Sequence, residues 1–305
     1  MVPNSQHELP LLPPLPLSVS AGRVPEWDFD DLILRKCPVC SGLNKMDICK
    51  RPDRLIVSRC LECGMLYLPA IPSEVQLKNF YASYAEYKKY YPPSFLSKMQ
   101  ILATKNPYIN ILQLTGGLRG QNICEVGCSY GQFLTQCSRL GASVMGVEWD
   151  INAINYLARN GIVTTFELPI NANLDVICAF QVIEHLEDPD TMISNASSSL
   201  VRDGRLLLFF PNGGECDEMG SSWLGFRVDL EHLNYFSLSS ISNLLQKHGL
   251  YVEHYWEYGQ PGVSRQKSQS TSSKIVTKLM SMICNENAPK FTDGKFILGI
   301  LARKN

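Results

Sequence analysis

Residues 125–131 have the sequence Glu-Val-Gly-Cys-Ser-Tyr-Gly and begin at the end of a short apolar segment, residues 122–126. The first glycine of this stretch allows the chain to turn sharply, and the second lets the backbone pass close to a ligand before a helix begins. A second apolar segment, residues 143–148, ends about 20 residues later in Glu148, which is placed to accept hydrogen bonds from ribose hydroxyls. The loop and the acid together predict a nucleotide-class binding site at the first helix of an open α/β sheet.

The glycine pattern of this loop separates two classes of ligand. A dinucleotide site needs Gly-x-Gly-x-x-Gly so that the pyrophosphate can approach the backbone, whereas this chain has Ser129 and Gln132 at the second and third glycine positions. The loop instead opens with an acid, Glu125, which suits a ligand that carries an ammonium group and no phosphate. The sequence therefore favours S-adenosylmethionine over a dinucleotide.

Apolar strand segments and helical segments alternate from residue 122 to the C-terminus. We expect strands at residues 122–126, 143–148, 174–180, 205–210, 250–257 and 296–302. We expect helices between them at residues 133–140, 151–159, 191–201 and 237–248. This alternation predicts an α/β fold in which helices cover both faces of a mostly parallel sheet.

Several runs of sequence, taken in order, resemble class I S-adenosylmethionine-dependent methyltransferases of the group that includes ubiquinone-type and sugar methyltransferases. They are Glu125 to Gly131, Gly146-Val147-Glu148, Phe180-Gln181-Val182-Ile183-Glu184-His185-Leu186-Glu187-Asp188-Pro189, Gly204-Arg205-Leu206-Leu207-Leu208 and Glu231-His232-Leu233-Asn234-Tyr235-Phe236-Ser237. The similarity covers about residues 120–258, and Ser129 replaces the family's usual middle glycine. It implies a Rossmann-like sheet of seven strands.

The resemblance also implies which residues bind S-adenosylmethionine, each group of them facing one part of the cofactor. They are Glu125, Gly127 and Gly131 for the methionine part, Glu148 for the ribose, Glu167 and Leu168 near the adenine, Gln181 near the methionine end, and the neighbouring Cys128 and Trp149.

Two cysteine pairs, Cys37-Pro-Val-Cys40 and Cys60-Leu-Glu-Cys63, are separated by a 19-residue gap. A tight turn at each pair directs two thiolates at one metal ion, and a gap of about 15–20 residues is long enough for a hairpin between the turns. This spacing predicts a zinc ribbon whose four cysteine ligands leave no open position, so the Zn²⁺ should be structural. The total of 11 cysteines is odd, which favours reduced thiols in the cytoplasm over a disulfide framework.

A four-cysteine ribbon, a tyrosine-rich linker and a methyltransferase core, in this order, are similar to the zinc-containing sugar C-methyltransferases of natural-product pathways. This resemblance implies catalytic roles for His185, Glu231 and His232. A histidine is suited to removing the proton of an oxygen or carbon acceptor because its pKa lies near neutrality. The alternative interpretation is that His185 caps its helix and that His232 only packs.

The sequence predicts four regions in the 305-residue chain. They are a Pro-rich disordered leader at 1–30, a zinc ribbon at 31–75, tyrosine-rich linker or lid helices at 76–118, and a methyltransferase domain at 119–305 with a polar insertion at 259–273. In the third region Tyr81, Tyr84 and Tyr87 recur at helical spacing and are followed by Tyr90 and Tyr91. They either pack in a linker helix or line a substrate pocket as a lid.

The distribution of charge along the chain indicates whether nucleic acid is a suitable partner. The chain has a net charge of −1, but residues 93–258 have a net charge of −8 and residues 259–305 a net charge of +6. An acidic centre is a poor match for a polyphosphate backbone, which disfavours nucleic acid as a partner. No run of about 20 apolar residues is present to span a bilayer.

These observations favour methyl transfer to a small-molecule acceptor, a sugar or another natural-product intermediate, at oxygen or carbon. One alternative is an RNA methyltransferase that docks its substrate on the zinc ribbon. The other is a binding protein that keeps the methyltransferase fold without catalysis. The sequence does not determine the oligomeric state.

Overall fold

The computed structural model describes residues 9–14, 24–88, 107–114, 116–259 and 294–305. Its internal contacts divide the chain into two compact units. The cysteine unit comprises Met1–Tyr90, Ile183–Asp190 and Pro211–Leu244. The sheet unit comprises Tyr91–Val182, Thr191–Phe210 and Leu245–Asn305. Two segments that follow strands of the sheet in the sequence, residues 183–190 and 211–244, therefore fold with the N-terminal part of the chain.

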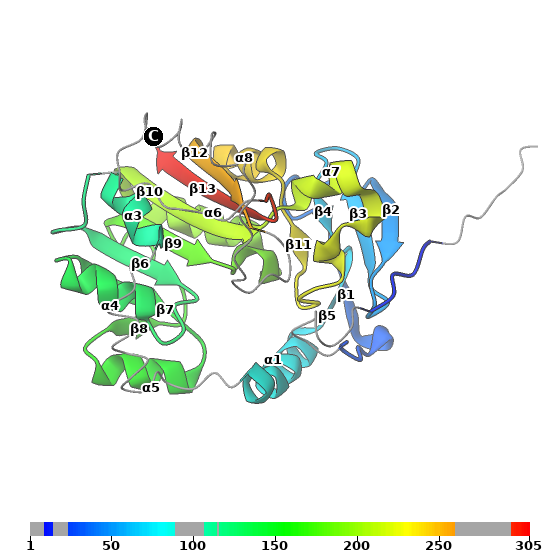
Figure 1. Ribbon diagram of the computed structural model, residues 1–305, viewed down its shortest axis with the longest axis horizontal. Helices are drawn as coiled ribbons and strands as arrows, with labels where there is room; N and C mark the ends of the chain where they lie inside the picture. The colour runs from blue at the N-terminus through cyan, green and yellow to red at the C-terminus, as the bar shows by residue number, and fades with distance from the viewer. Residues whose placement is uncertain (1–8, 15–23, 89–106, 115, 260–293) are drawn as a thin grey trace, which may run out of the picture. The chain divides into compact units, whose positions relative to one another are not determined.

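A seven-stranded sheet with the order β12-β13-β10-β9-β6-β7-β8 forms the centre of the sheet unit (Figure 1). Its strands are β6 (Asn122–Val126), β7 (Ser143–Val147), β8 (Val163–Thr165), β9 (Leu174–Phe180), β10 (Leu200–Pro211), β12 (Leu250–Tyr258) and β13 (Ile297–Lys304). The pairs β10–β9, β9–β6, β6–β7 and β7–β8 are parallel, and β12–β13 is antiparallel. The prediction of a mostly parallel, seven-stranded sheet is confirmed.

Helices connect the parallel strands and determine where a ligand can bind. The helix α4 (Gln132–Arg139) joins β6 to β7, α5 (Ile151–Arg159) joins β7 to β8, and α6 (Pro189–Ser199) joins β9 to β10. The chain moves away from β6 in opposite directions through β7 and through β10. Because such crossovers are right-handed, α4 and α5 cover one face of the sheet and α6 covers the other. Ligands bind at the carboxyl ends of the strands where this direction reverses, which is beside β6.

The largest differences from the predicted bounds are at β8 and β10. The edge strand β8 was not predicted, because it is three residues long and none of them is buried. The strand β10 begins at Leu200 rather than at residue 205, and α6 ends at Ser199. The polar residues at 202–204 conceal this start because they form an irregularity in the pairing with β9, where Asp203 has a φ of 64°.

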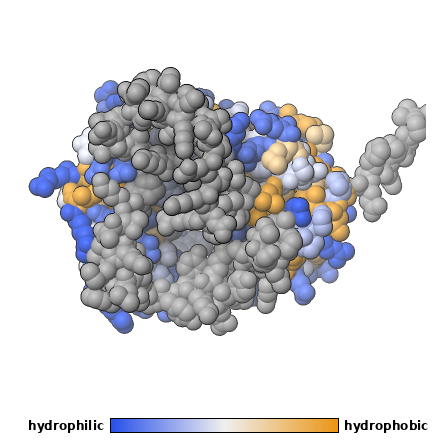
Figure 2. Space-filling model, viewed as in Figure 1, coloured by the Kyte–Doolittle hydropathy of each residue, from blue (hydrophilic) through white to orange (hydrophobic). Residues whose placement is uncertain are grey.

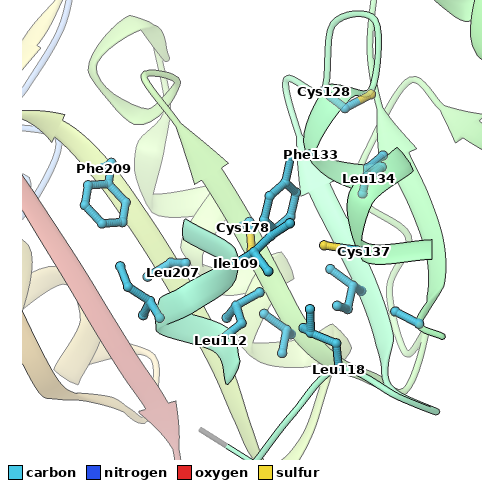
Figure 3. Packing of buried hydrophobic residues seen from close by; sticks show 14 of the residues in the cluster. Ile109, Leu112, Leu118, Cys128, Phe133, Leu134, Cys137, Cys178, Leu207 and Phe209 are labelled. Atoms are coloured by element: carbon cyan, nitrogen blue, oxygen red, sulfur yellow. The ribbon is translucent and has the colours of Figure 1, made fainter. Parts of the chain in front are cut away.

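Side chains from helices and strands of the sheet unit pack into one apolar core, and Figure 3 shows them close together. They include Ile109 and Leu112 of α3 (Pro107–Leu114), Phe133, Leu134 and Cys137 of α4, Cys178 of β9, and Leu207 and Phe209 of β10. Full burial of one such leucine or phenylalanine contributes about 1.5–3 kcal/mol. Cys137 and Cys178 are fully buried and act as small apolar side chains.

Short antiparallel strands build the cysteine unit. Four form a sheet with the order β11-β4-β3-β2, and two form the separate pair β1-β5. Their bounds are β1 (Leu32–Leu34), β2 (Lys45–Lys50), β3 (Ile56–Cys60), β4 (Leu66–Tyr67), β5 (Ala70–Pro72) and β11 (Asn234–Tyr235). The unit also contains the helix α1 (Glu74–Lys88), the 3₁₀ turns η1 (Phe29–Asp31) and η2 (Ile183–His185), and the short helix α7 (Cys216–Met219). The helix α8 (Leu238–Lys247) precedes β12.

The described part of the predicted leader is ordered, which corrects the prediction of disorder for 1–30. Leu12 N donates to Lys50 O at 2.8 Å, Trp27 is buried, and η1 begins at Phe29. The proline residues of this segment prevent a regular helix, but they do not prevent pairing with the edge strand β2. Residues 1–8 and 15–23 lie outside the described residues, as do residues 260–273 of the predicted insertion.

The surface of the described residues mixes hydrophilic and hydrophobic side chains (Figure 2). Single apolar side chains such as Leu34 and Leu43 are strongly exposed, which is normal for a folded surface. Among the described residues, no helix is both long and apolar enough to cross a membrane.

Candidate functional site

The loop between β6 and α4 turns at two glycines, as predicted. Gly127 has a φ of 69° and Gly131 a φ of 65°, a conformation that glycine adopts without steric cost. A Cβ at residue 127 would lie 2.6 Å from Cγ2 of Val182, and a Cβ at residue 131 would overlap Leu157. Only glycine therefore fits at both ends of this loop.

Glu125 lies at the end of β6 and is buried. Its Oε2 atom has no hydrogen-bond partner among the described residues. Burial, and to a smaller degree the charge of Glu148, raises the pKa of this carboxyl well above its ordinary value. A buried acceptor without a donor is costly, and a cationic donor such as an ammonium group would satisfy it. The carboxyl of Glu125 thus fits the amino group of a methionine moiety.

Glu148 connects the loop to the start of α5. Its carboxylate accepts hydrogen bonds from the backbone N–H of Ser129 at 2.7 Å, of Trp149 at 2.6 Å and of Asp150 at 2.9 Å. A carboxylate has about four acceptor positions, so about one is left for a ribose hydroxyl. Glu148 therefore organises the loop as well as offering an acceptor, a role that the sequence analysis did not assign to it.

Trp149 lies beside the segment that contains Glu167 and Leu168, the two residues predicted near the adenine. The Trp149 side chain is 69% exposed, and its Nε1 donates to Phe166 O at 2.6 Å. Glu167 follows directly, and Thr165 Oγ1 donates to Glu167 O at 2.7 Å, while Leu168 is buried. Phe166, which was not predicted as a site residue, has an exposed ring on the same backbone segment. The signal in the sequence was an aromatic residue directly before Glu167.

Gln181 and Cys128 differ in what they offer a ligand. Gln181 is exposed, has a φ of 57°, and donates from both its backbone N–H and its Nε2 to Phe209 O. A positive φ at a residue other than glycine is uncommon and often marks a functional position. The Cys128 thiol is buried against Gly146, where no Cβ would fit. Cys128 can therefore contact a ligand only through its backbone.

The four predicted metal ligands come together in the cysteine unit. The Sγ atoms of Cys37, Cys40, Cys60 and Cys63 all lie within 4.8 Å of one another, and two pairs are 3.5 Å apart. Four sulfurs bound at about 2.3 Å to one tetrahedral Zn²⁺ are about 3.8 Å apart, so this cluster fits the ion. Burial raises the pKa of the Cys37 thiol to about 11, which a bound dication would reverse. Cys49 is buried in β2 and is not part of the cluster.

The two predicted catalytic histidines also meet within the cysteine unit. The ring centroids of His185, at the end of η2, and of His232 are 4.6 Å apart. Tyr81 of α1 extends this group, because its hydroxyl lies 3.2 Å from Nδ1 of His185. Within the part of the tyrosine-rich stretch whose side chains are described, Tyr81 contacts a candidate site residue. The side chains of Tyr84 and Tyr87, and all of Tyr90 and Tyr91, lie outside the described residues.

Glu184 is the residue of this group that the sequence analysis missed. Its carboxyl and the two imidazoles place one ligand atom each within 4.8 Å of one another, an arrangement that could exchange protons or hold a metal ion. Both carboxyl oxygens are buried and have no hydrogen-bond partner among the described residues. Burial, with Asp229 and Glu231 adding to it, raises the pKa of Glu184 to about 8. The signal in the sequence was an acid directly before His185 in an apolar run.

Glu231 is buried beside these residues. Burial of the Tyr81 hydroxyl is the main cause of its raised pKa, and the charge of Glu231 is the second cause. The group of Tyr81, Glu184, His185, Glu231 and His232, which we term the acid–histidine cluster, therefore combines two imidazoles with two buried carboxyls and a phenol that stays protonated at neutral pH. Such a combination can take up and release a proton near neutrality.

A family model described as a methyltransferase domain matches residues 95–255 of this sequence. This match spans more than half of the chain. The chain belongs to the methyltransferase domain family. The resemblance found in the sequence is therefore confirmed at the level of the family.

Relatives of this methyltransferase-family chain include two ubiquinone biosynthesis O-methyltransferases. The one from Escherichia coli is 24% identical over 135 residues, which cover 40% of this chain and 54% of the relative. The one from Cupriavidus pinatubonensis is 27% identical over 100 residues, which cover 29% of this chain and 40% of the relative. The chain thus spans about half or less of the length of these curated relatives.

Solved structures with a similar fold have low sequence identity to this methyltransferase-family chain. Magnesium protoporphyrin IX methyltransferase from Synechocystis, solved with S-adenosylhomocysteine, is 14% identical, has a TM-score of 0.49, and is matched over 76% of this chain and 100% of its own. An S-adenosylmethionine-dependent methyltransferase from Mesorhizobium loti is 15% identical, has a TM-score of 0.45, and is matched over 62% of this chain and 93% of its own.

Proposed function

We propose that this protein transfers a methyl group from S-adenosylmethionine to a small-molecule acceptor. The observation that carries the proposal is the buried carboxyl of Glu125, whose Oε2 has no partner among the described residues, in the glycine-bounded loop of a methyltransferase-family sheet. When bound, S-adenosylmethionine supplies a methyl group on a positively charged sulfonium, and the neutral thioether that remains is a good leaving group.

The residues of the sheet unit have separate roles in this proposal. Glu125 binds the ammonium group, and Glu148 offers its remaining acceptor position to the ribose. Trp149 and Phe166 offer exposed rings to the adenine, since aromatic faces bind flat apolar groups. Gln181 keeps its side-chain carbonyl for the methionine end, because its amide group donates to Phe209 O.

A histidine of the acid–histidine cluster serves as the general base in the proposal. Tyr81 contacts Nδ1 of His185, and an imidazole of the cluster accepts the proton of the acceptor hydroxyl or carbon acid. The carboxylate of Glu231 stabilises an imidazolium once it forms. The names of the two relatives make a hydroxyl the first acceptor group to test, and a sugar carbon the second.

The zinc ribbon is structural in this proposal. Cys37, Cys40, Cys60 and Cys63 would bind Zn²⁺ with no position open to substrate. The ion would stabilise the fold of residues 31–75, which are too few to build an adequate core alone.

Two measurements test the proposed function. Titration calorimetry with S-adenosylmethionine, S-adenosylhomocysteine and NAD⁺ is expected to show binding of the first two and none of the third. A mass-spectrometric screen then offers phenols, catechols, nucleotide-linked sugars and structured RNA, and a gain of one methyl group on a small molecule is expected. Absence of S-adenosylmethionine binding would overturn the proposal and favour a binding protein that keeps only the fold. Methylation of RNA alone would also overturn it.

A further inference from the structure

Arg51 is a buried cation in the turn between β2 and β3. Its side chain is fully buried and pairs with Asp53, which is buried as well. All five guanidinium N–H groups have acceptors: Nε and Nη2 donate to the two oxygens of Asp53, Nη1 to His232 O and Tyr235 Oη, and Nη2 also to Leu230 O. An arginine has five N–H donors, so none is left unused.

The backbone acceptors of Arg51 lie on either side of Glu231. Nη2 donates to Leu230 O at 2.6 Å and Nη1 donates to His232 O at 2.6 Å. These residues are about 180 positions away in the sequence, and His232 N is held separately by Asp229 O at 3.0 Å. The planar guanidinium therefore fixes the backbone of the segment that contains Glu231 and His232.

The guanidinium is itself fixed in orientation. Trp27 Nε1 donates to Asp53 Oδ2 at 2.8 Å, and the backbone N–H of Leu55 donates to Asp53 Oδ1 at 3.3 Å. The carboxylate that receives two of the Arg51 donors can therefore not rotate freely. The turn at residues 51–54 joins β2 to β3, and β3 ends at the predicted zinc ligand Cys60. Arg51 in this turn therefore links the predicted zinc ribbon to the segment that contains His232.

Net stability does not account for this arrangement. A buried ion pair loses about as much hydration energy as it gains in attraction, and apolar replacements are often as stable. What a buried arginine adds is geometry, since its planar donors accept only one arrangement of partners. Here that arrangement includes the backbone carbonyls of Leu230 and His232, which lie on either side of the buried Glu231. The imidazole of His232 lies against that of His185.

We propose that Arg51 is a positioning residue that holds Glu231 and His232 in the acid–histidine cluster. The proposal rests on the proposed function for its catalytic consequence, since His232 matters for methyl transfer only if the protein transfers methyl groups. It gives the predicted zinc ribbon a role beyond folding. Through Arg51 the ribbon sets the place of a candidate base that comes from a distant part of the chain.

The test compares three full-length, zinc-loaded variants with the wild type. Arg51→Lys keeps a positive charge beside Asp53, but a lysine ammonium cannot reach both carbonyls. The double variant Arg51→Met with Asp53→Leu removes the ion pair without leaving a buried charge, in case the first variant does not fold. Arg205→Lys is the matched control, because Arg205 donates to Glu253 at 3.0 Å within the sheet unit.

The first readout is the NMR spectrum of ¹³C-labelled histidine, which needs no acceptor. The chain has five histidines, and the variants His185→Gln and His232→Gln assign the two of interest. Both Arg51 variants are expected to move the His232 ring signals and to shift their titration midpoint by about half a pH unit or more, with His248 unchanged. The control is expected to leave His232 unchanged, and bound zinc and S-adenosylmethionine affinity are expected to stay the same in all variants.

The second readout is turnover with an acceptor found in the screen. We expect kcat to fall about ten-fold or more in the Arg51 variants, since a small displacement of a catalytic group is costly, while Kd for S-adenosylmethionine stays the same. Unchanged His232 signals and unchanged kcat in both Arg51 variants would overturn the proposal. If no acceptor is methylated even by the wild type, the proposed function fails, and the histidine spectra still decide whether Arg51 positions His232.

Discussion

The hydroxyl oxygen of Tyr81 lies 3.2 Å from Nδ1 of His185. One imidazole nitrogen of His185 therefore has a hydroxyl partner, which donates or accepts according to the tautomer of the ring. Tyr81 comes from the helix α1 and His185 from η2, more than 100 positions later in the sequence. The tyrosine-rich stretch thus contributes to the acid–histidine cluster as well as to the path of the chain.

Replacement of Tyr81 by Phe tests the role of this contact. Tyr81→Phe removes the hydroxyl and keeps the ring, so we expect kcat to fall about ten-fold because His185 is less well oriented, with little change in Kd for S-adenosylmethionine. Initial rates with an acceptor from the screen measure the effect. Tyr255→Phe, an exposed position in β12, is the control. Equal rates for wild type and Tyr81→Phe would show that the contact has no part in turnover.

The raised pKa of Glu184 predicts that the free energy of unfolding depends on pH. Burial raises its folded-state pKa to about 8, above the unfolded value of about 4.3. The folded state therefore binds the proton more tightly, and the resulting stabilisation is fully present below the unfolded pKa and is lost as the pH rises through the folded pKa. Each unit of difference corresponds to about 1.4 kcal/mol.

Glu184→Gln should remove this dependence. We expect the free energy of unfolding of the wild type to fall between about pH 5 and pH 8, and the curve of the variant to be flatter and to lie above that of the wild type at the alkaline end. Urea titrations across this pH range provide the measurement. Glu26→Gln, at an exposed position, is expected to keep the slope of the wild type, and an identical slope in Glu184→Gln would contradict the assignment.

Glu125 makes cofactor binding depend on charge. Glu125→Gln should weaken S-adenosylmethionine binding about 10–100-fold, the equivalent of one charge-assisted hydrogen bond of about 1.5–3 kcal/mol. Because the pKa of Glu125 is raised in the free protein and an ammonium group would lower it, binding should release a proton and strengthen as the pH rises. Calorimetry in buffers of different ionisation enthalpy measures that proton. Glu257→Gln is the control, and equal affinity and proton release in Glu125→Gln would refute the contact.

The cysteine cluster predicts one zinc ion per chain. Cys60→Ser should abolish stoichiometric zinc and destabilise the cysteine unit by more than about 4 kcal/mol, since loss of a structural metal is among the most severe single changes. Elemental analysis gives the zinc content and thermal unfolding gives the stability. Cys49→Ala alters a buried cysteine outside the cluster and should keep the zinc. A Cys60→Ser protein with full zinc content would exclude this ligand set.

Local patterns were sufficient to predict most of the fold. The apolar segment at residues 174–180 and the helix at 151–159 occur at the predicted residues, because burial of an entire strand or of one helix face leaves a periodic signal in adjacent residues. The edge strand β8 and the first residues of β10 were missed, because a short, half-exposed strand and an irregular strand leave no such signal. The loop at residues 125–131 and the two cysteine pairs were also visible, since each lies within a few residues.

The sequence by itself therefore determined the family resemblance, the parallel sheet, the glycine-bounded loop and the candidate zinc ligands. Only the tertiary structure decided which distant residues meet: Arg51 with the backbone around Glu231, and Glu184 with His232. It also decided that Glu184 and Glu125 lose water, and hence that their pKa values rise. The reason is physical, since desolvation and convergence depend on contacts between segments separated by many residues, and such contacts leave no periodicity in either segment.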